Sequence, residues 1–287
     1  MMLWLDNPAL LILASVLMHV TWNLLARHVA ANANYLWWGL LAHTVLVAPY
    51  GIWCLLQSVQ WHSELLLCLL TSGLANSLYF LSLRRAYTYA PVALVYPLAR
   101  SSPILIAIWS ALLFSEMISG QAWIAIGIGV SGLWVLAASS RKGNARHALR
   151  WSFIAAFATS IYSLSDKLAV PSLPGFGAQL GFISVGYGMS LLLLTLLQYK
   201  DTGRYVPLQR PPWGYVLIGG LCLGTAYALV LRAMLYLPAA HVVAFTNGGV
   251  VLAVLLSLTL FRERQHWRSR LLGSLIVSAG LVWLGYA

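Results

Sequence analysis

The chain has 287 residues, of which 61% are hydrophobic and 8% charged, and its mean hydropathy is +0.81. A soluble domain has about 25% charged residues, so this composition excludes an ordinary soluble globular protein and indicates one that resides in a lipid bilayer. The formal net charge of +11 is then explained by loops that lie beside anionic lipid headgroups, and nucleic acid is not an expected partner.

Breaks at proline, glycine and charge clusters divide the chain into ten apolar runs, each long enough to cross a bilayer as a helix. Hydrophobicity that is continuous rather than alternating predicts helices and not a β-barrel. We therefore expect an all-α integral membrane protein with ten transmembrane helices, the first of them retained rather than cleaved as a signal. The runs lie at about 8–29, 35–57, 64–86, 92–114, 119–139, 150–169, 178–199, 212–236, 239–261 and 267–286.

The first and third runs carry polar residues at helical spacing. His19, Trp22 and Asn23 are spaced i, i+3, i+4 and fall on one helix face, and Asn76 and Tyr79 are one turn apart. Aromatic rings beside an amide suit a pocket for a small organic solute. The alternative is that these side chains only tie neighbouring helices together.

The fourth run contains Arg100 near the middle of an apolar stretch, one turn after Tyr96 and between Pro97 and Pro103. An arginine at the bilayer centre costs at least about 2.5 kcal/mol, so such a residue usually faces a wet interior. We predict that Arg100 binds a carboxylate, phosphate or phosphonate group through its planar donor fork. A structural tie to backbone carbonyls or to Asp166 is the alternative. The two prolines each remove a helical hydrogen bond and are candidate gating residues.

The second half supplies further candidates. Tyrosine hydroxyls there could orient a polar ligand but are also common at membrane interfaces. An acidic residue or a histidine within a run could serve coupling or gating, although a solitary histidine is more often a satisfied core residue. The candidates are Tyr162, Asp166 and Lys167 in the sixth run, Tyr227 in the eighth, and His241 and Asn247 in the ninth.

The chain repeats itself. The segment that begins at Arg84 aligns without a gap on the segment that begins at Leu231, a shift of 147, and both contain Arg-Ala-x-x-Tyr-x-Pro and Phe-x-Glu. Arg100 aligns with Asn247, so the predicted site is asymmetric. Interrupted helices at matching positions in two repeats point to the binding site of a transporter.

The repeat divides the chain into a first five-helix unit at 1–140, a basic linker at 141–149 and a second five-helix unit at 150–287. An odd number of helices in each unit places the second unit upside down relative to the first. Inverted repeats of this kind are the architecture of many secondary transporters, with the substrate near the midplane between the halves.

Basic residues cluster in alternate loops, which all lie on one face of a ten-helix chain. By the positive-inside rule that face is cytoplasmic, so both termini are expected outside the cytoplasmic membrane of a bacterium. The clustered residues are Arg27, Arg84, Arg85, Arg141, Lys142, Arg146, Arg150, Lys200, Arg204, Arg210, Arg262, Arg264, Arg268 and Arg270.

The duplicated five-helix unit, the Trp22–Asn23 pair, and the fourth and ninth helices that follow a proline and end in Phe-x-Glu resemble the EamA type of the drug/metabolite transporter superfamily. The resemblance covers essentially the whole chain. It implies ten helices around a central cavity lined by helices one, three and four of each half. It also implies export or exchange of amino acids, metabolites, drugs or nucleotide sugars.

Several absences narrow the function. Ala14 to Trp22 contain no acidic residue, which disfavours a proton-coupled exporter of lipophilic cations. The chain also lacks a Gly-rich phosphate loop, a clustered catalytic set and paired cysteines, so we expect no direct use of ATP, no enzyme activity, no cofactor and no metal. The predicted function is secondary transport of a small polar anionic or zwitterionic metabolite by a monomer or weak homodimer. A flippase for a lipid-linked intermediate and a multidrug exporter are the alternatives.

Overall fold

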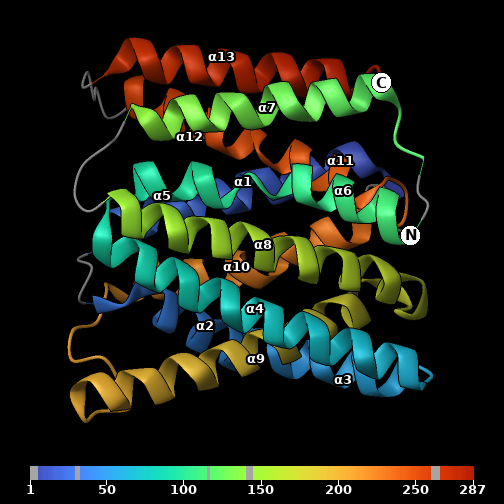
Figure 1. The fold of residues 1–287 in the computed structure, drawn as a ribbon. Coiled ribbons are helices and arrows are strands. Elements are labelled where there is room, and N and C mark those ends of the chain that lie inside the picture. Colours follow the sequence, from blue (N-terminus) through green and yellow to red (C-terminus); the bar gives the residue numbers. More distant parts are fainter. Residues whose placement is uncertain (1–5, 30–32, 115–116, 140–144, 260–265) are drawn as a thin grey trace.

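The structure, a computed structural model, describes residues 6–29, 33–114, 117–139, 145–259 and 266–287. Within these ranges the chain forms helices and no strand (Figure 1). The predicted all-α class is therefore confirmed. The elements in chain order are α1 (Pro8–Arg27), α2 (Tyr35–Leu46), α3 (Ala48–Ser58), α4 (Ser63–Tyr89), α5 (Val92–Ala99), α6 (Ser102–Phe114), α7 (Gly120–Ala138), α8 (Ala145–Ala169), the 3-10 helix η3 (Val170–Ser172), α9 (Gly175–Thr202), α10 (Trp213–Ala233), α11 (Ala239–Thr246), α12 (Gly248–Thr259) and α13 (Trp267–Leu284).

Eight spans in the described ranges are long and apolar enough to cross a membrane, and α5 with α6 and α11 with α12 each count as one of these spans. The pair α2–α3 passes the same test together but is bent by 53°. The last predicted run corresponds to α13, whose first turn carries Arg268 and Arg270 and is less apolar for that reason. The described part of the structure thus contains eight candidate spans, or nine if the bent pair α2–α3 is counted as one. The tenth predicted helix is α13, which is not among these candidates.

Local sequence signals explain where several helices begin. Pro8 stands at the start of α1, and the Asn7 side chain accepts hydrogen bonds from the backbone nitrogens of Ala9 and Leu10, at 3.0 and 3.2 Å. An asparagine cap followed by proline is a typical helix start because it satisfies donors that have no intrahelical partner. The Ser119 hydroxyl caps α7 in the same way.

Two spans are interrupted at matching positions of the repeat. The α5–α6 span breaks at Arg100 and Ser101, and the α11–α12 span breaks at Asn247. Pro103 lies in the first turn of α6 and cannot donate a hydrogen bond to the preceding turn. The paired glycines after Asn247 weaken helical continuity in the other half. Both predicted interruptions are therefore present.

The packing of helices follows the repeat. α4 packs on α8 and α1 packs on α10, and these two pairs exchange when the halves are interchanged. The same relation connects α4–α9 with α2–α10, and α6–α8 with α1–α12. Figure 1 shows α7 with α13 at one side of the bundle and α3 with α9 at the other, and each of these pairs joins counterparts of the two halves.

Small residues allow the two flanking pairs to approach closely. A Cβ atom added to Gly132 of α7 would lie 2.6 Å from the backbone nitrogen of Val277 in α13. A Cβ on Gly181 of α9 would collide with the backbone of Gly51 in α3. Glycine removes that obstruction, as it does at many helix crossings in membranes.

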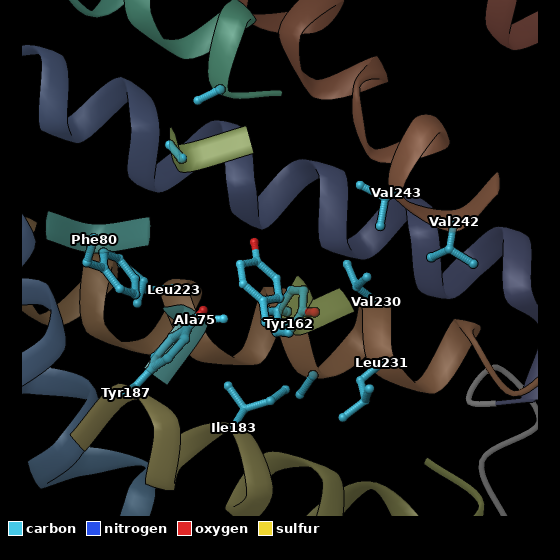
Figure 2. Packing of buried hydrophobic residues seen from close by; sticks show 14 of the residues in the cluster. Ala75, Phe80, Tyr162, Ile183, Tyr187, Leu223, Val230, Leu231, Val242 and Val243 are labelled. Carbon is cyan, nitrogen blue, oxygen red and sulfur yellow. The ribbon is translucent and has the colours of Figure 1, made fainter. Parts of the chain in front are cut away.

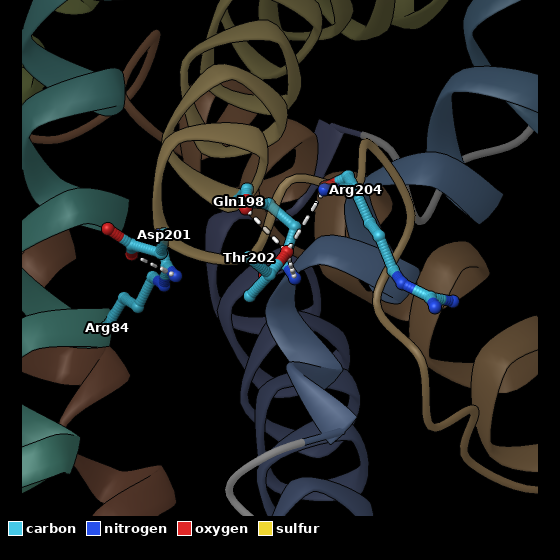
Figure 3. Close-up of polar contacts among 5 residues, drawn as sticks. All are labelled: Arg84, Gln198, Asp201, Thr202 and Arg204. Carbon is cyan, nitrogen blue, oxygen red and sulfur yellow. Dashed lines mark hydrogen bonds and ion pairs between the residues drawn. The ribbon is translucent and has the colours of Figure 1, made fainter.

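Each end of the bundle carries an ion pair between an arginine and an aspartate. The chain termini lie at the same end (Figure 1), where Asp6 pairs with Arg232 at 2.8 Å and accepts from the Tyr236 hydroxyl at 2.9 Å. That hydroxyl and the Arg232 guanidinium hold the pKa of the exposed Asp6 carboxyl below its ordinary value. At the opposite end Arg84 of α4 pairs with Asp201 of α9 at 2.9 Å, as Figure 3 shows.

Candidate functional site

A cavity lies between the two halves of the bundle. The space open to the centres of water-sized spheres is about 30 Å³, room for about two waters. Its walls come from α1, α4, α8, α9, α10, α11 and the break between α5 and α6. The lining residues are His19, Trp22, Asn76, Tyr79, Phe80, Arg100, Thr159, Tyr162, Ser163, Tyr187, Leu223, Tyr227, Val230, Val243 and Thr246.

Arg100 is the only arginine or lysine in that lining. Its Nε and Nη2 donate to the Tyr96 hydroxyl at 3.0 and 2.9 Å, and its Nη1 donates to the Thr246 hydroxyl at 3.2 Å. A guanidinium has five N–H donors, so these contacts leave two for a ligand. Within the described residues no carboxylate forms an ion pair with Arg100. The charge is held in place by neutral partners.

Two asparagines support the arginine from outside the cavity. Asn23 donates to the His19 carbonyl at 2.8 Å and to the Tyr96 hydroxyl at 3.3 Å. Asn247 donates to the Arg100 carbonyl at 3.2 Å, across the interface between the halves. Asn23 thus positions the Tyr96 hydroxyl, and Asn247 holds the break between α5 and α6. Neither asparagine lines the cavity, where both were predicted to lie.

His19 lies on the cavity wall with its imidazole already engaged on one side. Its Nδ1 lies 2.9 Å from the Ser15 carbonyl and 3.1 Å from the Ser15 hydroxyl. A carbonyl can only accept, so Nδ1 carries the hydrogen in this contact and the Nε2 of a neutral ring remains an acceptor. The wall therefore offers a ligand both cationic donors and a neutral acceptor.

Aromatic rings form the rest of the wall. Tyr162 makes edge-to-face contacts with Tyr79 and Tyr227, with ring centroids 5.8 and 5.3 Å apart. Tyr187 makes a similar contact with Phe80 at 5.4 Å. Figure 2 shows Phe80, Tyr162 and Tyr187 packed with aliphatic side chains of the same cluster. These contacts fix the tyrosine hydroxyls in position because each ring is locked by its neighbours.

Asp166 lies behind this aromatic wall. Its side chain is 0% exposed, and its Oδ2 accepts a hydrogen bond from the Tyr227 hydroxyl at 2.7 Å. Within the described residues its Oδ1 has no hydrogen-bond partner. The carboxyl group is thus adjacent to the cavity wall without being part of it.

The other predicted coupling or gating residues are distributed around the site. The Lys167 ammonium donates to the carbonyls of Met234 and Leu237 at 2.5 and 3.1 Å, at the C-terminal end of α10. A cation there complements the helix dipole. Pro97 lies inside α5. Pro103 lines a second cavity, of about 10 Å³, together with Asn247.

Seven of the ten predicted substrate-binding residues line the main cavity: His19, Trp22, Asn76, Tyr79, Arg100, Tyr162 and Tyr227. Asn23, Tyr96 and Asn247 instead contact Arg100 or its partner, and His241 is half-buried on α11 outside that lining.

The sequence prediction missed several polar wall residues, among them Thr159, Tyr187 and Thr246. Thr246 could have been found from the repeat. It is next to Asn247, which aligns with Arg100, so it is a polar residue at the position of the second half that corresponds to the predicted site. Tyr187 has Ser184 and Ser190 one helical turn away on either side, and this spacing is the signal that could have found it.

The chemistry of the cavity favours binding over reaction. The wall combines one guanidinium, one imidazole, hydroxyl and amide groups, and aromatic rings, and none of the wall residues is acidic. Within the described residues no group of three or more histidine, cysteine, aspartate or glutamate side chains is placed to hold a metal ion. Such a wall suits a small polar ligand that carries negative charge.

Comparisons with known proteins bear on the family and the fold of the chain. The model of the EamA-like transporter family matches residues 7–138. A crystal structure whose title reads only "Crystal structure of protein" superposes with a TM-score of 0.71 at 18% identity, over 97% of this chain and 97% of that one. That identity shows a shared fold alone. No curated protein matches the sequence.

Proposed function

The chain is an EamA-type member of the drug/metabolite transporter superfamily, and from this premise we propose that it moves a small anionic or zwitterionic metabolite across the cytoplasmic membrane by alternating access. Members of the EamA family are transporters, not enzymes. The substrate binds in the central cavity, with its negative group on Arg100.

The observation that carries this proposal is the state of Arg100. A guanidinium inside a membrane bundle normally has an acidic partner, because an unpaired buried charge is costly. Here its described partners are the hydroxyls of Tyr96 and Thr246, and two of its donors remain. An anionic ligand supplies the missing countercharge, which gives such a ligand a large share of its binding energy at this position.

The architecture that we propose is ten transmembrane helices in two inverted units of five, over 1–140 and 150–287. The reciprocal packing of α1–α10 with α4–α8, and the two breaks at Arg100 and Asn247, support it. In this arrangement α2–α3 is one bent span and α13 is the last. The cavity then lies at the interface of the two units, where inverted-repeat transporters bind substrate.

Alternating access explains why the cavity is small. A space of about 30 Å³ holds about two waters and no metabolite, so the conformation described here is closed around the site. The Asp6–Arg232 pair joins α1 to α10 at one end, and the Arg84–Asp201 pair joins α4 to α9 at the other. In our proposal the substrate enters when one of these ends separates.

Thermal-shift screening tests the proposal directly. Purified protein is assayed against anionic, zwitterionic and cationic metabolites, in wild type and in Arg100→Gln. We expect stabilisation by compounds of the first two classes, since a ligand at 100 times its Kd stabilises by about 2.7 kcal/mol. Glutamine keeps hydrogen-bonding capacity but removes the charge, so affinity should fall by about 10- to 100-fold, and the same loss should appear in vesicle transport.

Arg204→Gln is the matched control, because Arg204 is exposed in the loop after α9 (Figure 3). It should leave stabilisation and transport unchanged. Stabilisation of the wild type by cations alone, or equal ligand binding by a well-folded Arg100→Gln protein, would contradict the proposal.

A further inference from the structure

The buried carboxyl group of Asp166 has no role in the anion site described above. It is 0% exposed and lies on α8 within a candidate membrane span. Neither of the ion pairs in the described part of the chain includes it. A carboxyl group in such a place requires an explanation, because burying an unpaired carboxylate is among the most costly events in a protein interior.

Two hydroxyl groups lie against the Asp166 carboxyl group, those of Tyr227 and Ser72. Tyr227 of α10 donates to its Oδ2 at 2.7 Å. Lys167, its neighbour in sequence, points its ammonium to the carbonyls at the end of α10. The other titratable side chains that interact with Asp166 are Cys68 from α4, Tyr162 from α8 and Tyr187 from α9. Two further elements that pack on α8 are α5, which leads to Arg100, and α11, which carries His241.

The hydrogen bonding of the two carboxyl oxygens is unequal. Oδ2 has the Tyr227 hydroxyl, whereas Oδ1 has no partner within the described residues. A carboxylate in a low-dielectric site needs several donors to remain charged. The hydroxyls of Tyr227 and Ser72 are both neutral and are too few to balance a buried charge. A proton on the carboxyl group removes the penalty of that charge.

We propose that Asp166 is a buried proton-binding site whose state is transmitted to the transport cavity by the Tyr227 hydroxyl. The inference rests on the proposed function, because the cavity is taken to be the substrate site. Tyr227 is the link, since its side chain lines the cavity and bonds to Asp166.

The link follows from the single hydrogen of the Tyr227 hydroxyl. When Asp166 is charged, that hydrogen is committed to Oδ2. When Asp166 carries a proton, the carboxyl hydrogen can donate to the Tyr227 oxygen, and the phenolic hydrogen turns toward the cavity. The protonated state therefore presents one more donor to a ligand, and by linkage an anion in the cavity favours protonation of Asp166.

A neighbouring aromatic ring keeps the Tyr227 side chain in place between Asp166 and the cavity. Tyr162 packs edge-to-face against Tyr227 with centroids 5.3 Å apart. Rotation of the Tyr227 ring would break that contact, so a change of protonation is accommodated by turning the hydroxyl hydrogen and not by moving the ring.

Infrared titration of the protein in lipid nanodiscs tests the proposal with the proton itself as the probe. We expect the carbonyl stretch of a protonated carboxylic acid at neutral pH, lost as pH rises, and absent in Asp166→Asn. Asp201→Asn is the matched control, because Asp201 lies in an exposed ion pair and should leave the signal intact. A wild-type signal at neutral pH no larger than that of Asp166→Asn would overturn the proposal.

Tyr227→Phe keeps the carboxyl group and removes its donor. The signal should then persist to higher pH than in wild type, because the charged form has lost its hydrogen bond. An unchanged titration would refute the link to the cavity, and this variant also serves if Asp166→Asn does not fold.

Arg100→Gln separates the two proposals. Under the proposed function it should weaken anion binding by about 10- to 100-fold while retaining the carboxylic-acid signal of Asp166. If anion binding is unchanged in Arg100→Gln, the proposed function has failed. If the carboxylic-acid signal is missing in the wild type while anion binding depends on Arg100, the proton-binding site has failed.

Discussion

The orientation of the Arg100 guanidinium depends on one hydroxyl group. Tyr96 accepts from both Nε and Nη2 of Arg100, and Asn23 donates to the same oxygen. Thr246 of the other half takes a third N–H. These contacts hold the planar group in one orientation, and bidentate recognition of a carboxylate or phosphate requires a guanidinium fork fixed in this way.

Removal of that hydroxyl should weaken ligand binding without removing the charge. Tyr96→Phe deletes a hydrogen-bond acceptor of a charged group, an interaction worth about 1.5–3 kcal/mol, and we expect a loss of affinity of about 10-fold or more for the compounds that stabilise the wild type. Thermal-shift titration measures it. Tyr50→Phe is the control, since Tyr50 is 60% exposed on α3, and an equal effect of both changes would refute the role of Tyr96.

Helix contacts at the flanks of the bundle depend on glycine. Gly132 of α7 faces the backbone of Val277 in α13, and Gly280 of α13 faces Gly129 of α7. The helices touch backbone to backbone there, and backbone cannot move aside as a flexible side chain can. Gly127, on the same helix, has no atom within 4 Å of the position of an added Cβ.

This difference predicts opposite effects of one substitution. Gly132→Ala should lower Tm, because overpacking costs about 1–3 kcal/mol. Gly127→Ala should leave Tm unchanged or raise it, since alanine is favoured over glycine in a helix by about 1 kcal/mol. Size-exclusion thermostability in detergent measures both, and a Gly132→Ala protein as stable as Gly127→Ala would show that the α7–α13 contact is not close.

The molecule as a whole has two unlike ends. The chain termini share one end with the Asp6–Arg232 pair, whereas the other end carries most of the basic residues that the structure describes, including Arg84, Arg204 and Arg210. A basic end faces the cytoplasm under the positive-inside rule. The proposal that follows is that both termini lie outside the cytoplasm.

Cysteine labelling of intact cells tests this topology. In a background with Cys54, Cys68 and Cys222 replaced by serine, Tyr286→Cys should react with a membrane-impermeant maleimide, because Tyr286 is 86% exposed beside the C-terminus. Arg204→Cys should react only after permeabilisation. The reverse pattern would place the termini in the cytoplasm.

Much of the helix pattern could be predicted because a bilayer imposes it directly. A spanning segment must be long and apolar, so such segments can be identified in the sequence without knowledge of how the helices pack. Arg100 could be singled out for the same reason, since a charged residue within a long apolar segment is rare. The bend between α2 and α3 was not predicted, because Val47 and Ala48 at the break give no local signal beyond the nearby Pro49.

The candidate site was predictable only in part. His19, Trp22 and Tyr79 line the cavity as expected, whereas Asn247 bonds to the Arg100 carbonyl instead of facing a ligand. Sequence spacing places side chains on a helix face, but which neighbour that face meets depends on packing between distant segments.

The sequence by itself determined that the chain crosses a membrane through apolar helices, that one of its segments is repeated 147 residues later, and that a fixed cation lies within a span. Each of these follows from composition and position along the chain. Only the tertiary structure decided that Arg100 bonds to Tyr96 and Thr246 and has no carboxylate partner in the described residues, that Tyr187 joins the wall, and that Asp166 lies buried behind Tyr227. The physical reason is that each of these depends on which helices of the two halves face each other, and that choice is made by the packing of the whole bundle.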